Sequence, residues 1–510
     1  MVEPVQRLDL KGVRLGAPSA ERDILDGLEH YFIKSDAYRR VANREKTVIL
    51  GNRGSGKSAI FQVLASGLRK RGAVVIELAP EDYSYEMLSA ALASEDQGSW
   101  AKVGAYAAAW KYLIYVLLMK ELVAKSGGKY GRGPLAKIAR YVRDNHSSSD
   151  ISKLSALIGY LKRIEGVKIG PAEASFRTRE LEKLYKLDEI NALLPELKQV
   201  LAQQPAVIFV DELDRGWDAS EDAQAFVAGM FQACMAMNSQ STDLTVYMSL
   251  RQELYDNIPA LYDDAQKFRD VIETISWNEA GLMELIVARL RHSSPTLRDL
   301  PLNDAVWSSV FVETLTYRKS RSFNYLVDRT LYRPREFIQL CGDVIEEATS
   351  AGLAAPLDYQ TITSAEYAYS EARTKDIASE YRFQYPGLLE VFEQFRGSVH
   401  LLDRESLEFT CLEAITQAED SSVGVDGWLS SLEPEGLIQI LWEVGFLRAR
   451  ALGGIKAERR SGSSYLGSHQ VNRLNLDLIR NFQIHQMFRS YLGTREPKST
   501  TPTVGQARAD

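Results

Sequence analysis

The chain has 510 residues, of which 45% are hydrophobic and 25% are charged. This is the ordinary composition of a globular protein, and the length suits two to four domains. The formal net charge of −7 excludes a whole-chain basic bias toward nucleic acid, so any surface that binds nucleic acid must be local.

Cysteine usage and the N-terminal residues indicate a cytoplasmic protein. The three cysteines, Cys234, Cys341 and Cys411, are scattered and odd in number, which predicts a reducing compartment without disulfide bonds or a zinc site. Residues 1–6 lack the pattern of a signal peptide. The apolar stretch 105–119 contains a lysine and is shorter than the roughly 20 residues that span a bilayer. We therefore expect a buried helix there and no membrane contact.

The first strong motif lies at residues 51–58, which read Gly-Asn-Arg-Gly-Ser-Gly-Lys-Ser and fit G-x-x-x-x-G-K-[ST] without a mismatch. In this pattern backbone N–H groups cradle the α- and β-phosphates of a nucleotide, Lys57 reaches the β- and γ-phosphates, and Ser58 offers its hydroxyl to Mg²⁺. A β-branched run at 47–50 and a helical apolar spacing at 59–64 disfavour the alternative, a glycine-rich surface turn. The predicted nucleotide-binding residues are Gly51, Asn52, Arg53, Gly54, Ser55, Gly56, Lys57, Ser58 and Ala59.

The apolar runs that follow predict a parallel sheet covered by helices on both faces, because continuous apolar strands alternate with helical segments. The predicted strands after the motif are 73–78, 206–210, 244–250 and 271–275. A helical insertion at about 95–203 interrupts the series, since apolar residues recur every three or four positions at 151–164 and 190–201. From residue 278 to about 437 the pattern predicts helices only.

Two carboxylates end the strand at 206–210. Asp211 is placed to hold Mg²⁺, directly or through water, and Glu212 is placed to polarise the attacking water. Acidic residues that merely cap a strand end are the alternative, which the intact P-loop disfavours. Asp214 is a second partner of the site or a helix N-cap, and the sequence does not separate the two.

The next strand also ends in polar residues. Ser249 or Arg251 could contact the γ-phosphate, because this strand lies beside the P-loop strand in sheets of this class; an exposed strand-end arginine is the alternative. Lys267 and Arg269, shortly before the last strand, could supply an arginine finger to a second copy.

A helix start is predicted at residues 331–337, with Pro334 in the first turn. Arg333 and Arg335 oppose the helix macrodipole at this end, which makes sense if one of them points at bound phosphate. The alternative is a pair of solvated or salt-bridged arginines.

These motifs resemble those of AAA+/STAND-type P-loop ATPases, and most closely those of origin-recognition-type and KAP-like bacterial ATPases, which are often encoded among mobile-element and anti-phage defence genes. The matching residues are Gly51–Ser58 for Walker A, Val207–Glu212 with Asp214 and Arg215 for Walker B, Arg251 near sensor 1, and Arg333 and Arg335 for sensor 2. The resemblance covers roughly residues 30–350. It implies an ATPase that uses Mg²⁺ held by Ser58 and Asp211, with Lys57 and Glu212 in catalysis.

Two departures from the family stand out. The connection between the Walker A unit and the Walker B strand is much longer than usual, and the sensor 1 position lacks the common asparagine. Both argue against a regular hexamer and an unfoldase role, although the resemblance still favours a homo-oligomer or an effector protein as partner.

The C-terminal part resembles a winged-helix domain, with a helix turning into a strand at 437–447, a glycine-marked hairpin, and the segment 482–488. It is locally basic, and so is the stretch 120–144. For each of the two stretches an ordinary solvated face is the alternative. The predicted DNA contacts are Arg448, Arg450, Arg459 and Arg460. His485 lies in an apolar run, which is typical of a core residue. The rival hypothesis is an ATP-driven switch whose insertion and C-terminal domains bind proteins and not DNA.

The predicted fold class is therefore α/β, a parallel-sheet P-loop core of the AAA+ kind with a helical insertion, an α-helical lid and a winged-helix-like C-terminal domain. The predicted divisions are an N-terminal helical segment at 1–45, the ATPase core at 46–278 with the insertion at 95–203, the lid at 279–357, a helical linker domain at 358–425, the winged-helix-like domain at 426–495 and a disordered tail at 496–510.

Overall fold

The computed structural model describes residues 8–79, 99–128, 130–146, 187–213, 217, 220–262, 268–420, 427–450, 465–471 and 474–497. The chain divides into two compact units, residues 16–277 and residues 1–15 with 278–510. The first unit carries the P-loop motif. The predicted helical pattern at 151–164 lies outside the described residues.

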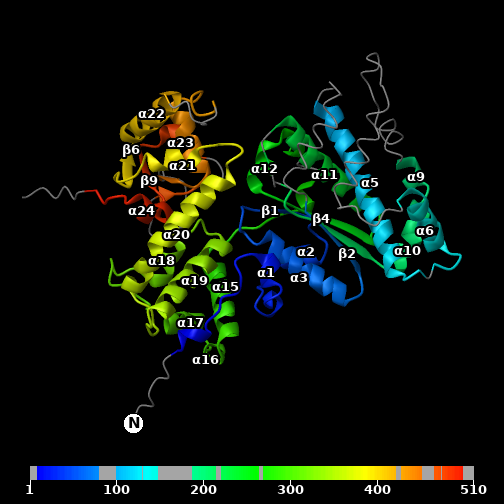
Figure 1. The fold of residues 1–510 in the computed structure, drawn as a ribbon, viewed down its shortest axis with the longest axis horizontal. Helices are drawn as coiled ribbons and strands as arrows, with labels where there is room; N and C mark the ends of the chain where they lie inside the picture. The colour runs from blue at the N-terminus through cyan, green and yellow to red at the C-terminus, as the bar shows by residue number, and fades with distance from the viewer. Residues whose placement is uncertain are drawn as a thin grey trace, which may run out of the picture. The chain divides into compact units, whose positions relative to one another are not determined.

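A five-stranded sheet forms the centre of the unit 16–277 (Figure 1). Its strands are β1 (Val48–Leu50), β2 (Val74–Leu78), β3 (Ala206–Val210), β4 (Leu244–Leu250) and β5 (Ile272–Thr274). Their order is β2-β3-β4-β1-β5, and every neighbouring pair is parallel. The predicted parallel sheet is thus confirmed, and β4 lies directly beside β1 as expected.

Helices cover both faces of this sheet (Figure 1). The helices of the unit are α1 (Ala20–Asp23), α2 (Asp36–Ala42), α3 (Lys57–Lys70), α5 (Ser99–Lys125), α6 (Pro134–Asn145), α9 (Leu187–Asn191), α10 (Leu194–Gln203), α11 (Glu221–Gln240), α12 (Gln252–Asn257) and α13 (Pro259–Tyr262). On one face, Phe61 of α3 packs against Phe209 and Tyr247. On the other, α5 and α11 share one large apolar core with the alternate strand residues.

The apolar stretch 105–119 forms part of α5 and is buried along most of its length, as predicted. The backbone of α5 approaches α11 closely, because a Cβ on Gly229 would stand 2.5 Å from Cβ of Tyr106. The indole N–H of Trp110 donates to the carbonyl of Phe226 at 3.3 Å. This helix of the predicted insertion therefore belongs to the core of the sheet. Among the described residues, no helix is long and apolar enough to cross a membrane.

The unit that begins at residue 278 is largely helical. Its helices are α15 (Glu279–Ser293), α16 (Pro295–Arg298), α17 (Asn303–Val310), α18 (Ser322–Val327), α19 (Pro334–Ser350), α20 (Tyr359–Glu380), α21 (Leu388–Glu393), α22 (Arg404–Asp420), α23 (Pro434–Glu443) and α24 (Gln486–Leu492). The prediction of helices only, up to about residue 437, was wrong at β6 (Leu401–Asp403). A three-residue strand is too short for its alternation to stand out in a sequence.

Strand β6 belongs to a small C-terminal sheet with β7 (Leu447–Arg450), β8 (Tyr465–Leu466) and β9 (Asn481–Ile484), in the order β6-β9-β7-β8. The pairs β7–β8, β7–β9 and β6–β9 are antiparallel. The helix-to-strand passage predicted at 437–447 is present as α23 followed by β7. The winged-helix assignment stays a prediction.

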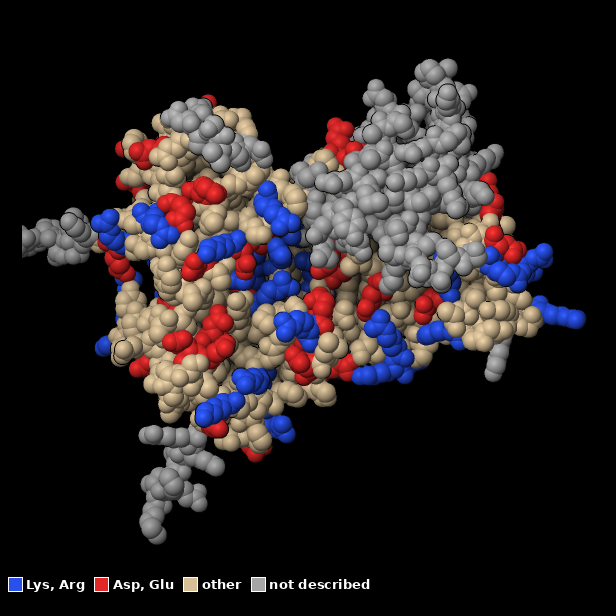
Figure 2. All heavy atoms as spheres, viewed as in Figure 1, with Lys and Arg blue, Asp and Glu red and all other residues tan. Residues whose placement is uncertain are grey.

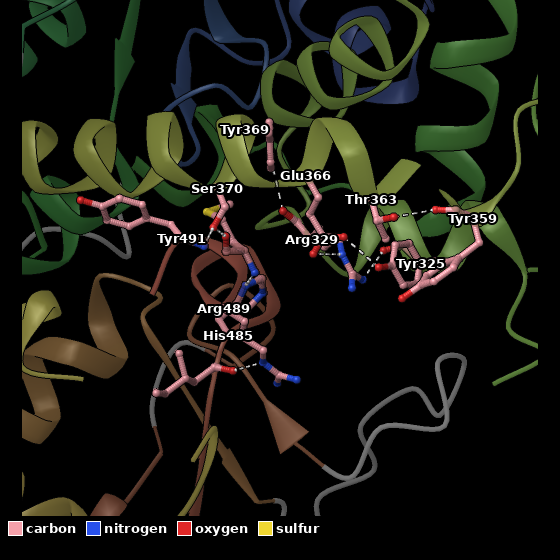
Figure 3. A network of polar contacts seen from close by, with 12 residues as sticks. Tyr325, Arg329, Tyr359, Thr363, Glu366, Tyr369, Ser370, His485, Arg489 and Tyr491 are labelled. Atoms are coloured by element: carbon pink, nitrogen blue, oxygen red, sulfur yellow. Dashed lines mark hydrogen bonds and ion pairs between the residues drawn. The ribbon is translucent and has the colours of Figure 1, made fainter. Parts of the chain in front are cut away.

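A buried polar network joins α18 to α20, and α20 to α24 (Figure 3). Glu366 on α20 accepts from the Tyr325 hydroxyl at 2.8 Å and pairs with Arg329 at 2.8 Å. Further along α20, Ser370 donates to the carbonyl of Met487 at 2.5 Å and accepts from the N–H of Tyr491 at 3.0 Å. Because paired partners offset the cost of burying such groups, the network fixes α20 against α24.

The start of the predicted disordered tail needs correction. Glu496 pairs with Arg318 and accepts from the Tyr317 hydroxyl at 2.9 Å, and Arg495 forms a β-bridge with Val399. Residues up to 497 are thus placed by ordinary contacts, and the rest of the predicted tail lies outside the described residues.

Candidate functional site

The P-loop connects the carboxyl end of β1 to the N-terminus of α3. Gly54 and Gly56 have φ values of +75° and +99°, which L side chains rarely adopt, so glycine is required at both positions. Gly56 is the N-cap of α3, and Lys57 is the first helical residue. The ammonium group of Lys57 donates to the carbonyls of Gly51 and Asn52, at 2.8 and 3.1 Å. The loop therefore surrounds the ammonium group of Lys57, which the motif predicts to contact the phosphates of a nucleotide.

The geometry of the loop fits a phosphate group. The N–H of Gly56 meets no acceptor among the described residues, and the helix N-terminus behind it carries partial positive charge. A Cβ on Gly51 would stand 2.6 Å from the Ser55 hydroxyl oxygen and 3.3 Å from the carbonyl of Ile275. A side chain at position 51 would therefore require the Ser55 hydroxyl and the backbone of Ile275 to shift. Ser58 and Ala59 lie half-buried in the first turn of α3, and Arg53 is exposed.

Asp211 follows β3 at the same edge of the sheet, because all five strands are parallel. Its Oδ1 accepts a hydrogen bond from the buried Ser249 hydroxyl on β4 and another from the N–H of Glu212 at 2.9 Å. Asp211 N–H in turn donates to the carbonyl of Leu78 at 2.9 Å. Strand β4 thus holds the carboxylate of Asp211 through Ser249, and β2 holds the backbone of Asp211, at the edge of the sheet where the P-loop lies.

Glu212 is exposed and has a φ of +56°, an uncommon conformation for a residue with a side chain. Such a conformation is found disproportionately at functional sites. Arg251 is the N-cap of α12 directly after β4, and its guanidinium lies 3.5 Å from the Glu253 carboxylate. Of Ser249 and Arg251, the two candidates named for this strand end, Ser249 contacts the predicted metal-binding carboxylate. Contact of either residue with the γ-phosphate stays a prediction.

The predicted helix start at Arg333 is confirmed, because α19 begins at Pro334. Arg333 itself is buried, and its guanidinium lies 3.2 Å from Glu380 and 3.5 Å from Glu336. Arg335 is half-buried in the first turn. Arg333 thus matches the salt-bridged alternative, and Arg335 stays the candidate for phosphate contact.

The predicted DNA contact of Arg448 requires correction. Arg448 is 3% exposed and donates to the side-chain oxygen of Gln486 at 2.9 Å and to the carbonyl of Tyr465 at 2.8 Å. Burial lowers the pKa of its guanidinium, which is the cost of removing the charge from water. A residue so enclosed does not reach a phosphate backbone. Arg450 is exposed.

Several predicted residues lie outside the described part of the chain, namely Asp214, Arg215, Lys267, Arg459 and Arg460. Arg269 is exposed at the start of a short 3-10 helix, Arg269–Val271, that precedes β5. On the face drawn in Figure 2, basic and acidic side chains are interspersed, in keeping with the acidic net charge. His485 is buried and accepts from the N–H of Met487 at 3.2 Å, and burial lowers its pKa well below the ordinary value, which confirms a core residue.

Sequence reasoning missed Trp277, whose indole N–H donates to the carbonyl of Ser55 in the P-loop at 2.8 Å. The two residues are 222 positions apart, so no local pattern could connect them. Its place just after the last predicted strand, at the sheet edge that carries the P-loop, was the available signal.

Comparisons with known proteins give a partial match. Residues 280–378 match the family model of the FunZ-associated C-terminal helical domain. The putative transposon gamma-delta 80.3 kDa protein of Escherichia coli (strain K12) is 22% identical over 464 residues, which cover 85% of this chain and 61% of that protein. The chain therefore spans less than two thirds of the length of this curated relative.

Two solved structures are similar at low scores. The Aeropyrum pernix ORC1 protein in complex with DNA gives a TM-score of 0.38 at 10% identity, covering 90% of this chain and 92% of that one. The Aeropyrum pernix ORC2 protein, in ADPNP and ADP complexes, gives a TM-score of 0.32 at 10% identity and covers 92% of each chain.

Proposed function

We propose that this protein binds ATP with Mg²⁺ and hydrolyses it. One observation carries the proposal: the complete P-loop after β1 and the Asp211–Glu212 pair after β3 end at the same edge of a parallel sheet, where Ser249 of the intervening strand β4 holds Asp211. Parallel sheets bind their ligands at this edge.

Each residue has a role that its position supports. Lys57 and the N–H groups of the loop bind the phosphates, and the hydroxyl of Ser58 together with Asp211 would hold Mg²⁺. The metal, when bound, neutralises charge on the phosphate oxygens. Glu212 orients the attacking water and accepts its proton. Ser249 keeps Asp211 in the orientation that leaves Oδ2 available.

The direct test is nucleotide binding and hydrolysis by the purified chain and by Lys57→Ala. The variant should lose ATP binding, because the charge that faces the β/γ-phosphates is gone. Lys70→Ala is the matched control, since Lys70 lies at the far end of the same helix α3 and is exposed there. Undiminished hydrolysis by Lys57→Ala would falsify the proposal.

We further propose that the nucleotide state is coupled to DNA binding or assembly. The exposed Arg450 and Arg480 support a basic surface in the C-terminal part, and the name of the curated relative, a putative transposon protein, supports a mobile-element context. A role in anti-phage defence rests on the family resemblance alone. The resemblance to AAA+ ATPases supports a homo-oligomer or an effector protein as a further partner. The burial of Arg448 weakens the DNA hypothesis and favours the alternative, a protein-interaction switch that acts on a separate effector.

A gel shift with and without ATP decides between the two. DNA binding that falls steeply with salt supports the first, because it reports phosphate contacts. Absence of binding at low salt by a chain that hydrolyses ATP supports the switch.

A further inference from the structure

Trp277 connects the end of the unit 16–277 to the P-loop. It is half-buried, and its indole N–H donates to the carbonyl of Ser55 at 2.8 Å. That carbonyl shares a peptide unit with the N–H of Gly56. In a trans peptide the C=O and the N–H point in opposite directions. The hydrogen bond from the indole therefore fixes the direction in which the Gly56 N–H points.

This anchor matters because the loop offers few other constraints on that peptide. The orientation of the Ser55–Gly56 peptide depends on ψ of Ser55 and φ of Gly56, and Gly56, at φ +99°, has no side chain that restricts its half of this rotation. The hydroxyl of Ser55 is buried and makes no hydrogen bond with the described residues, so the side chain does not fix the peptide. The Gly56 N–H meets no acceptor among those residues, as expected for a donor kept for a ligand.

We propose that Trp277 is a positioning residue of the phosphate site: its indole N–H holds the Ser55–Gly56 peptide with the Gly56 N–H directed at the phosphates of a bound nucleotide. The inference rests on the proposed nucleotide binding and adds a residue to it. Trp277 also directly precedes Asn278, whose side chain caps α15 by accepting from the N–H of Gly281 at 2.9 Å.

The test is Trp277→Phe, which removes the N–H and keeps an aromatic ring. The Kd for Mg-ATP and Mg-ADP should rise roughly three- to tenfold, the range for one lost hydrogen bond. KM should rise by the same factor while kcat changes less than about twofold, because Lys57 and Glu212 remain. The nucleotide-induced change in tryptophan fluorescence should also shrink in this variant.

The matched control is Trp428→Phe. Trp428 is also half-buried and also donates its indole N–H to a backbone carbonyl, that of Pro386, at 2.8 Å, but it lies in the other unit. Its replacement should lower thermal stability to a similar degree and leave the nucleotide Kd unchanged. An equal loss of affinity in both variants would show a general effect of destabilisation and overturn the proposal.

If Trp277→Phe does not fold, β-(3-benzothienyl)alanine at position 277 removes the N–H and preserves the shape of the ring system. Unchanged Kd in either folded variant overturns the role of Trp277 and leaves the proposed function standing. Absence of ATP binding in the wild-type chain, in contrast, removes both.

Discussion

The hydroxyl of Ser249 donates a hydrogen bond to Oδ1 of Asp211 across the boundary between β4 and β3. The same oxygen also accepts from the N–H of Glu212, so its acceptor sites are directed into the protein. Oδ2, which makes no hydrogen bond with the described residues, is left for the metal or its water. Ser249 therefore determines which face of the carboxylate is presented at the sheet edge.

Ser249→Ala should weaken the use of Mg²⁺ in hydrolysis. Loss of a hydrogen bond to a charged group is worth about 1.5–3 kcal/mol, so kcat/KM should fall about tenfold or more, and more Mg²⁺ should be needed for half-maximal rate. A magnesium titration of the rate measures this. Thr245→Val is the control, because Thr245 is buried on the same strand and makes no contact with Asp211. An unaltered magnesium dependence would contradict the assigned role.

Glu212→Gln should bind ATP and lose turnover. The amide has the size of the carboxylate but cannot accept a proton, so the rate should fall by roughly a hundredfold or more. Since glutamine adopts the positive φ of position 212 no worse than glutamate does, the loop should keep its conformation. Single-turnover hydrolysis and a binding isotherm separate the two effects. Glu221→Gln, an exposed change in the first turn of α11, should leave both as they are.

We expect Arg333 to stabilise the fold and Arg335 to contribute to ATP hydrolysis. Arg333→Ala removes a buried guanidinium that pairs with Glu336 and Glu380, which should cost about 3 kcal/mol of unfolding free energy. Arg335→Ala should lower the melting temperature less than Arg333→Ala does and slow hydrolysis more than about tenfold, or about 1.4 kcal/mol of barrier. Melting curves and rates of both variants provide the measurement. Normal rates in Arg335→Ala would leave it as a surface arginine.

How much the sequence predicts depends on how local the signal is. The predictions of the P-loop, of the strands β1–β5 and of the start of α19 at Pro334 are confirmed. Each of these features depends on a pattern within a few adjacent residues. The burial of Arg448 was missed because its partners lie 17 and 38 residues further along the chain, on β8 and α24. A count of basic residues does not say which of them turn inward.

The same reasoning explains the candidate site. Asp211 and Glu212 could be named from the apolar run before them, whereas the hydrogen bond from Ser249 depends on which strands are neighbours. The assignment of Trp277 to the site depends on its hydrogen bond to Ser55, a residue 222 positions earlier in the chain. Such contacts follow from the packed fold and leave no periodicity in the sequence.

Asp343 should make stability depend on pH. Burial raises the pKa of its carboxyl to about 6, with Arg373 lowering it in part. The pKa of Asp343 is higher in the folded than in the unfolded state, where it lies near 4. The unfolding free energy is therefore highest below about pH 4 and falls as the pH rises toward 6. Asp343→Asn should therefore raise the unfolding free energy at pH 7.5 by roughly 1 kcal/mol, less than a full burial would give because the side chain is partly in contact with water. At pH 4 the substitution should change the unfolding free energy little. Urea unfolding at both pH values checks this; an equal effect at the two would refute it.

Replacement of Arg450 and its basic neighbours tests whether the C-terminal surface binds DNA. Replacement of the exposed Arg450 together with Arg459 and Arg460 by alanine should weaken DNA binding across all sequences and flatten its salt dependence, since phosphate contacts carry no sequence information. ATP hydrolysis without DNA should persist, because none of the three belongs to the nucleotide site. Arg448→Ala is not an equivalent change: it leaves a buried void beside Gln486 and should lower the melting temperature first. If the triple variant binds DNA as the wild-type chain does at every salt concentration, the basic segment is not the DNA contact, and binding must be sought in the stretch 120–144.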